Sequence, residues 1–207
     1  MQPETQTPKE HQSIRLFEND TLERLSHVHP ITPLVFWSPV AAWLLWRSVS
    51  LYDFGIGDLL AMALAGMFAW TLAEYLLHRF VFHFPAKSKI GKWFVFIFHG
   101  NHHHDPKDKT RLVMPPAGGV PIMALLYLFF DLFVPQPWLQ PFFAFFIIGY
   151  LCYDYIHYAT HHFPMKGRVA KFLKHYHLKH HFSGEGGRYG VSSPLWDWVF
   201  GTRPDSH

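Results

Sequence analysis

Four stretches of the chain are apolar for long enough to approach the length of a lipid bilayer. A spanning helix needs about 17 to 25 mostly apolar residues. The candidate spans are residues 33–51, 56–82, 118–134 and 138–158, of which the third is the shortest. The turn between the first two falls within LYDFGIGD and that between the last two within VPQPWLQ, so the spans pair as two tight hairpins. The pattern predicts an all-α integral membrane fold with four transmembrane helices.

Polar residues lie in three places: before the first span, between the two hairpins, and after the fourth span. Residues 1–30 lack the short apolar core of a secretory signal, so we expect them to form a loose amino-terminal tail. Residues 31–207 then make up one membrane domain. The polar stretches that follow each hairpin predict a helical cap at one face of the membrane.

Basic residues give the predicted topology. Of the 18 Lys and Arg residues, three lie in the tail, seven lie between 79 and 111, and seven lie between 166 and 203. The short connections inside the hairpins have none. Because basic residues concentrate in cytoplasmic segments, we expect both termini and the cap to be cytoplasmic, in the endoplasmic reticulum or a bacterial inner membrane. The basic residues follow this topology rule, so they give no indication of nucleic-acid binding.

The composition adds one strong signal, because the chain contains 17 histidines in 207 residues and a single cysteine, Cys152. One cysteine excludes internal disulfides and a Cys/His zinc finger. Ten of the histidines form four short clusters, each next to a span or in the cap. The predicted metal ligands are His78, His83, His99, His102, His103, His157, His161, His177, His180 and His181.

The spacing within the clusters has a geometrical meaning. Histidines at positions i, i+3 and i+4 share one helical face, so each HxxHH triad is expected to point at a common centre. His157 and His161 are four apart and face the same way. His78 and His83 are five apart, or roughly 140° around a regular helix. They are therefore expected to serve two different metals, unless the helix is unwound there.

A lone histidine is more often a hydrogen-bonded core residue than a ligand, but ten in register on one side of a membrane are best explained together. Imidazole favours iron, copper, zinc or nickel over magnesium and calcium, without choosing among the four. Ten ligands exceed what one ion accepts, so two ions with about five nitrogens each are expected. The lack of carboxylate ligands at a membrane face favours a di-iron oxygenase.

The same boxes resemble those of the membrane fatty acid hydroxylase superfamily. The motifs are HxxxxH from His78, HxxHH from His99, HxxxH from His157 and HxxHH from His177. The flanking sequences HGNHHHDP, DYIHYATHH and YGVSSPLWDWVFGT resemble those of fatty acid 2-hydroxylases. The resemblance covers residues 74–202. Eukaryotic members commonly carry an amino-terminal cytochrome b5 domain, for which residues 1–30 are too short.

The resemblance implies hydroxylation at carbon 2 of a fatty acyl chain, either a free fatty acid or the N-acyl chain of a ceramide. It implies two iron ions, with zinc as a possible substitute in purified protein, and dioxygen as co-substrate. Two electrons would come from a separate donor such as cytochrome b5, or ferredoxin with its reductase. Ligands at the ends of spans also favour carbon 2 from the residues themselves, because that carbon lies near the headgroup level.

Other residues and other functions stay open at this point. Glu74 and Asp154 lie one turn before His78 and His157, where each could accept the second imidazole N–H of a ligand. A sterol or carotenoid oxygenase of the same superfamily is the alternative function. A membrane metal transporter is disfavoured, because transport needs polar ligands within the spans and an opening on both sides.

Overall fold

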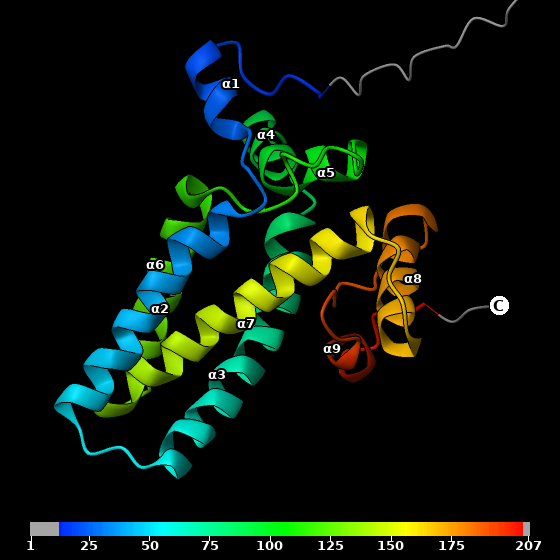
Figure 1. Cartoon of the computed structure of the whole chain (residues 1–207). Coiled ribbons are helices and arrows are strands. Elements are labelled where there is room, and N and C mark those ends of the chain that lie inside the picture. Colours follow the sequence, from blue (N-terminus) through cyan, green and yellow to red (C-terminus); the bar gives the residue numbers. More distant parts are fainter. Residues whose placement is uncertain (1–12, 205–207) are drawn as a thin grey trace, which may run out of the picture.

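The computed structural model describes residues 13–204, and all regular structure in that range is helical. The body consists of four apolar helices (Figure 1). They are α2 (Thr32–Leu51), α3 (Ile56–Leu77), α6 (Pro116–Asp131) and α7 (Gln136–His162). Shorter helices cap this body. They are α1 (Asp20–Ser26), α4 (Lys89–Val95), α5 (Asn101–His104), α8 (Arg168–Phe182) and α9 (Leu195–Val199).

Three of the four predicted spans are confirmed as helices that are long and apolar enough to cross a membrane. They are Thr32–Leu51, Ile56–Phe82 and Gln136–His162. The second includes α3 and the π-helical turn η1 (His78–Phe82) that continues it. The fourth candidate, α6, has 16 residues and is about 24 Å long at 1.5 Å per residue, which is less than a hydrocarbon core of about 30 Å. Its crossing of the membrane therefore stays a prediction.

Helix α7 is the central helix of the bundle. Most of its length is buried, whereas α2 and α3 expose large apolar side chains such as Trp46, Leu64 and Phe68. Apolar faces of this kind suit contact with lipid, whereas their exposure to water would be unfavourable. The core between the helices is mainly aromatic, with Trp70 of α3 packing edge-on against Phe146 and Tyr150 of α7. The buried position of α7 thus gives His157 and His161, near its end, a fixed support.

Two glycines allow α3 and α7 to approach closely. A Cβ atom added at Gly66 would lie 2.3 Å from the carbonyl oxygen of Phe142, and one added at Gly149 would lie 2.7 Å from Cβ of Trp70. No side chain fits at either place. Small residues at such crossings let helix backbones pack directly, as is common between membrane helices.

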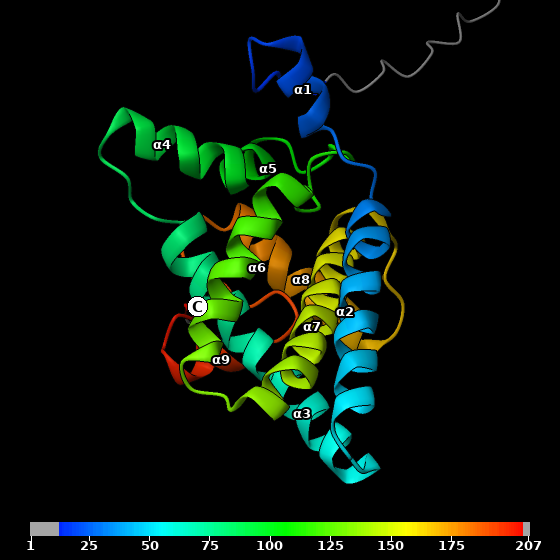
Figure 2. The same cartoon turned by 90° about the vertical axis from the view of Figure 1, so that its left-hand side faces the viewer.

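Both hairpins turn at the same end of the body, so α3 and α7 both end at the other (Figure 1; Figure 2). The short connections are residues 52–55 and 132–135. Helices α4 and α5 lie beyond the far end of α3, and α8 lies beside the end of α7. This arrangement brings all four histidine clusters to one end of the molecule, as the sequence predicts.

The expectation of a loose amino-terminal tail is wrong for residues 13–30, while residues 1–12 lie outside the described part. Glu23 of α1 accepts hydrogen bonds from two main-chain N–H groups of the segment before it and is ion-paired with Arg111. Val28 donates its N–H to the carbonyl oxygen of Thr110 at 2.8 Å. The segment therefore docks on the loop between α5 and α6, through polar contacts that sequence periodicity does not reveal.

The close approach of α3 and α7 gives a stability prediction. Changing Gly66 to Ala should lower the free energy of unfolding by about 1–3 kcal/mol, the usual cost of overpacking, because the new methyl group meets backbone that cannot rotate away. The measurement is the thermal unfolding midpoint of the purified protein in detergent. Gly57→Ala is the control, since a Cβ there meets nothing within 4 Å. Equal midpoints for the two variants would contradict the packing argument.

Candidate metal centre

All ten predicted ligands converge at the capped end of the bundle, in two groups of five. Within each group, one ring nitrogen of every histidine lies within 4.8 Å of the corresponding nitrogens of the others. Group A consists of His78, His83, His99, His103 and His180. Group B consists of His102, His157, His161, His177 and His181. Each group draws on three separate parts of the chain, so the sites exist only in the folded bundle.

The two HxxHH triads do not each point at one centre, and this expectation is wrong. His99 and His103 enter group A while His102 enters group B; His177 and His181 enter group B while His180 enters group A. Neighbouring residues on a helix are about 100° apart, which lets consecutive histidines reach different centres. The triads therefore link the two groups, and the rings of His103 and His181 stack across the boundary at 4.0 Å.

The first box also differs from expectation, because His78 and His83 both belong to group A. The reason is the π-helical turn η1, in which the N–H of His83 bonds the carbonyl oxygen of His78 at 3.0 Å. An i→i+5 hydrogen bond places residues five apart above one another, where a regular helix would separate them. Of the two expectations for this box, a locally unwound helix is therefore closer to the observed structure than ligation of two different metals.

A second π-helical turn, η2 (Phe96–Gly100), carries His99. The side-chain amide of Asn101 donates hydrogen bonds to the carbonyl oxygens of Phe96 and Ile97, at 3.0 and 2.7 Å. Without these bonds the two carbonyl oxygens would lack good hydrogen-bond donors, because the regular hydrogen-bond ladder of the α-helix is interrupted there. Asn101 therefore stabilises the local helix distortion that orients the histidines of the second box, HxxHH from His99.

Two main-chain carbonyls fix the tautomers of group A histidines. The oxygen of Tyr189 lies 2.5 Å from Nδ1 of His78, and that of Gly187 lies 2.7 Å from Nδ1 of His180. A carbonyl oxygen only accepts hydrogen bonds, so both Nδ1 atoms carry the proton. In a neutral imidazole the Nε2 atom then carries a lone pair, and in both histidines this atom faces the centre of the group.

These lone pairs test whether the residues fit a bound cation. Nε2 of His99 lies 3.0 Å from Nε2 of His78 and 3.0 Å from Nε2 of His103. Nε2 of His103 also lies 3.2 Å from Nε2 of His180. If His99 and His103 donate to the two fixed lone pairs, both of their Nε2 atoms carry a proton, and neither has a lone pair to accept from the other across 3.0 Å. A cation at the centre removes this conflict, because all the nitrogens can then present lone pairs to it.

The distances in both groups suit shared ligation. In group B, Nε2 of His102 lies 3.1 Å from that of His157, and Nε2 of His177 lies 2.8 and 3.0 Å from those of His161 and His181. Two imidazole nitrogens about 2.0–2.1 Å from one metal ion and 90° apart are separated by about 2.9 Å. The donor set is all nitrogen and fits iron, copper, zinc or nickel.

Burial keeps these imidazoles in the form that binds metal. Loss of solvent, followed by the neighbouring His180, lowers the pKa of His83 to about 4. Loss of solvent, with His180 and His83 next in weight, lowers the pKa of His103 to about 2. Loss of solvent, followed by the neighbouring His157, holds the pKa of both His102 and His177 well below the ordinary value. Neutral imidazole is the ligand form, so little proton release opposes binding at neutral pH.

Neither Glu74 nor Asp154 has a histidine among the hydrogen-bond partners that the described residues give it. Glu74 accepts hydrogen bonds from the main-chain N–H groups of Val191 and Ser192, at 2.6 and 2.9 Å. Asp154 accepts one from the hydroxyl of Tyr150 at 3.3 Å. Glu74 therefore acts on the histidines through the carboxyl-terminal loop. Sequence reasoning missed the two carbonyls of that loop, because main-chain groups leave no signal in residue identity.

A narrow, mainly apolar cavity lies between α3, α6 and α7 and reaches both groups. Its histidine lining is His99 of group A and His157 of group B. Along α7 the lining continues from His157 to Tyr150, about 10 Å at the helical rise. The remaining wall is mainly apolar, including Leu77, Phe82, Phe98, Leu112, Ile122 and Met123. A wall of this composition, ending at two histidines, is chemically suited to a hydrocarbon chain.

Comparisons with known proteins agree with this site. A family model described as fatty acid hydroxylase matches residues 63–202. The chain is 38% identical over 193 residues to a dihydroceramide fatty acyl 2-hydroxylase of Arabidopsis thaliana, covering 92% of this chain and 80% of the relative. It is 40% identical over 185 residues to a ceramide very long chain fatty acid hydroxylase of Saccharomyces cerevisiae, covering 84% of this chain and 47% of the relative. The chain thus spans about half the length of the yeast protein.

A solved structure is similar over most of the fold. It is described as full-length scs7p with only the hydroxylase domain visible, and it matches with a TM-score of 0.84 at 36% identity. The match covers 91% of this chain and 71% of the other. At this identity the likeness extends to the sequence as well as to the arrangement of helices.

The division into two groups predicts two separable binding events. Metal-free protein titrated with Co²⁺ is expected to take up two equivalents, measured by calorimetry and elemental analysis. His83→Ala should weaken one equivalent at least about tenfold, and His161→Ala the other, because each removes a nitrogen from a different group. His104→Ala is the matched control, since this exposed neighbour belongs to neither group. Weakening of the same equivalent by both variants would show that the division is wrong.

Proposed function

The chain belongs to the fatty acid hydroxylase family and is a hydroxylating enzyme, and we propose that it hydroxylates carbon 2 of a fatty acyl chain. The reaction uses dioxygen, two electrons and two protons; one oxygen atom enters the C–H bond and the other leaves as water. The observation that carries the proposal is a single apolar cavity lined at one end by His99 and His157, one histidine from each group.

Groups A and B would each hold one iron ion, with zinc as a substitute in purified protein. When bound, the metal pair supplies the activation of dioxygen. The chain's own part is to present ten neutral imidazoles in fixed orientations. The carbonyl oxygens of Tyr189 and Gly187 hold protons at Nδ1 of His78 and His180, which directs both Nε2 lone pairs inward. A ligand set fixed in this way does not have to reorganise when a metal ion binds.

The cavity orients the substrate. Apolar side chains such as Leu77, Phe82 and Met123 take the hydrocarbon chain and keep water away from the reacting carbon. Histidines at the ends of α3 and α7 put the reacting position at the level of the lipid headgroups, where carbon 2 of an acyl chain lies. The names of the Arabidopsis and yeast relatives support a ceramide-type N-acyl chain, and a free fatty acid offers the same carbon.

The proposed topology has four spans, with both termini and the histidine groups in the cytoplasm of the endoplasmic reticulum or of a bacterial inner membrane. The support is the distribution of Lys and Arg together with the turning of both hairpins at the end opposite to the histidines. A separate electron donor, such as cytochrome b5 or ferredoxin with its reductase, would then approach from the cytoplasmic side. Residues 31–207 would form the membrane domain.

The substrate is tested by lipid mass spectrometry of cells that express the chain. Expression should raise 2-hydroxy acyl lipids, and His102→Ala or His180→Ala should reduce them to background, because each variant removes a nitrogen from one of the two groups. His104→Ala is expected to keep the wild-type level. If protein that takes up two metal ions leaves 2-hydroxy acyl lipids unchanged, the substrate assignment is wrong although the oxygenase class survives.

The cavity wall gives a second test. Ile122→Trp should lower turnover at least about tenfold, and most for the longest acyl chains, because the added ring fills the space that holds the chain. Val120→Trp is the matched control on the same helix, since Val120 is exposed and does not line the cavity. Product chain lengths are read by mass spectrometry. Identical product profiles for the two variants would place the acyl chain outside this cavity.

A further inference from the structure

Asp197 on α9 is a buried carboxylate that belongs to neither histidine group. It is 0% exposed. Its Oδ1 accepts hydrogen bonds from the main-chain N–H of Tyr189 at 2.8 Å and from the hydroxyl of Thr202 at 2.7 Å. Its Oδ2 accepts one from the N–H of Gly190 at 2.7 Å. Burying a carboxylate costs free energy unless hydrogen-bond donors of this kind compensate for the lost water. A structural or functional role is therefore expected for Asp197.

Glu74 continues the same pattern along the loop. Glu74 accepts hydrogen bonds from the N–H groups of Val191 and Ser192, as Asp197 does from those of Tyr189 and Gly190. Four successive main-chain donors, in residues 189–192, therefore point at two buried carboxylates. The backbone of this segment is therefore held in one orientation from both ends.

The carbonyl oxygens next to these donors are the ones that contact the histidines. Tyr189, whose N–H bonds Asp197, gives its oxygen to Nδ1 of His78. Gly187, two residues earlier, gives its oxygen to Nδ1 of His180. The ring of Tyr189 lies 5.7 Å from the rings of His78, His83 and His180, measured between centroids. Every one of these contacts is to group A.

The loop cannot shift without losing this fit. A Cβ at Gly190 would lie 2.0 Å from the carbonyl oxygen of Ser193 and 3.0 Å from Oδ2 of Asp197, so only glycine allows the approach. The helix that carries Asp197 is anchored on α3, the helix that leads into His78. Trp196 donates its indole N–H to the hydroxyl of Thr71 at 2.9 Å.

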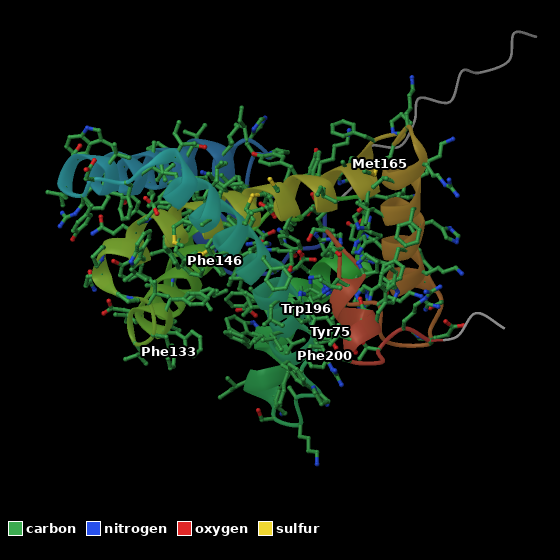
Figure 3. All side chains as sticks on the ribbon, turned by 90° about the horizontal axis from the view of Figure 1, so that it is seen from below. Tyr75, Phe133, Phe146, Met165, Trp196 and Phe200 are labelled. Carbon is green, nitrogen blue, oxygen red and sulfur yellow. The ribbon has the colours of Figure 1, made fainter. Side chains whose placement is uncertain are left out.

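The anchoring of α9 is also aromatic. The ring of Phe200 stacks on Tyr75 of α3 at 5.3 Å, and the ring of Trp196 packs on Phe200 at 5.9 Å. Figure 3 shows these three side chains together, well away from Phe146 in the membrane core. Asp197 is thus fixed relative to the same helix that holds Glu74 and His78.

We propose that Asp197 is a positioning residue for group A alone: it orients the loop whose two carbonyls set the tautomers of His78 and His180. The inference rests on the proposed function, in that group A holds a metal ion. Asp197 touches neither metal ligand nor cavity; it acts through the backbone. Its loss should weaken metal binding at group A about 10–100-fold, as for other groups that orient a ligand, and leave group B unchanged.

The test is Co²⁺ titration of the full chain carrying Asp197→Asn, which keeps the side chain's size but turns one acceptor into a donor facing an N–H group. One of the two equivalents should weaken 10–100-fold, as estimated for groups that orient a ligand. Combining Asp197→Asn with His161→Ala should weaken the remaining strong equivalent, whereas combining it with His83→Ala should add little. Asp53→Asn, the same change at an exposed aspartate, is the control.

The outcomes separate the two levels of the argument. If unaltered protein takes up fewer than two equivalents, the proposed metal pair is wrong. If it takes up two and Asp197→Asn binds both as before, the positioning role is wrong. Parallel loss of both equivalents would also overturn the inference, because it would make Asp197 a residue needed for folding in general. Glu74→Gln provides a second variant, with the same selective weakening expected at group A.

Discussion

The structure depends on one constraint: in each histidine group, imidazole nitrogens lie about 3 Å apart in a largely buried space, and in group A no arrangement of protons pairs all of them. In group A the protons of His78 and His180 are committed to main-chain carbonyls, so the inward nitrogens cannot all pair with one another. A cation resolves the conflict, and without one the same rings repel. The surrounding structure therefore has to hold them in place, through the buried helix α7, the two π-helical turns and the carboxyl-terminal loop.

Much of this could be predicted from the sequence, because it follows from periodicity. The length of the apolar stretches predicts helices close to their observed limits, and the ten predicted ligands are the ten histidines that converge in the structure. The assignment of each histidine to its group could not be predicted. It depends on π-helical turns, which place His83 on the same side as His78, and on the 100° between neighbours, which separates His102 from His103. Residue spacing reports the faces of a regular helix, and these boxes lie where the helix is irregular.

The contacts of Glu74 show the same limit of sequence-based prediction for a residue outside the set of ligands. A carboxylate one turn before a histidine suggested direct contact, yet Glu74 binds a loop more than a hundred residues later in the chain. Its partner in that task, Asp197, lies in a short helix with no histidine nearby in sequence. The docked segment of residues 13–30 is a further case: the hydroxyl of Ser13 donates to Asp108 and Glu23 pairs with Arg111, and both partners look like ordinary loop charges in the sequence. Long-range polar contacts of this kind involve single residues and main-chain groups, so they leave no periodic trace.

The two groups are supported in different ways, and this difference bears on how the site works. Group B takes four of its five histidines from α7 and α8, as pairs four residues apart, so regular helix geometry orients them. Group A takes its histidines from the two π-helical turns and their ends, a short helix and α8, and loop carbonyls fix the tautomers of two of them, His78 and His180. The cavity touches one histidine of each group: His157, which the regular helix α7 orients, and His99, which lies in the π-helical turn η2. The two groups therefore depend on different contacts: group A on hydrogen bonds from a loop far along the chain, which two buried carboxylates hold in place, and group B on the regular geometry of two helices.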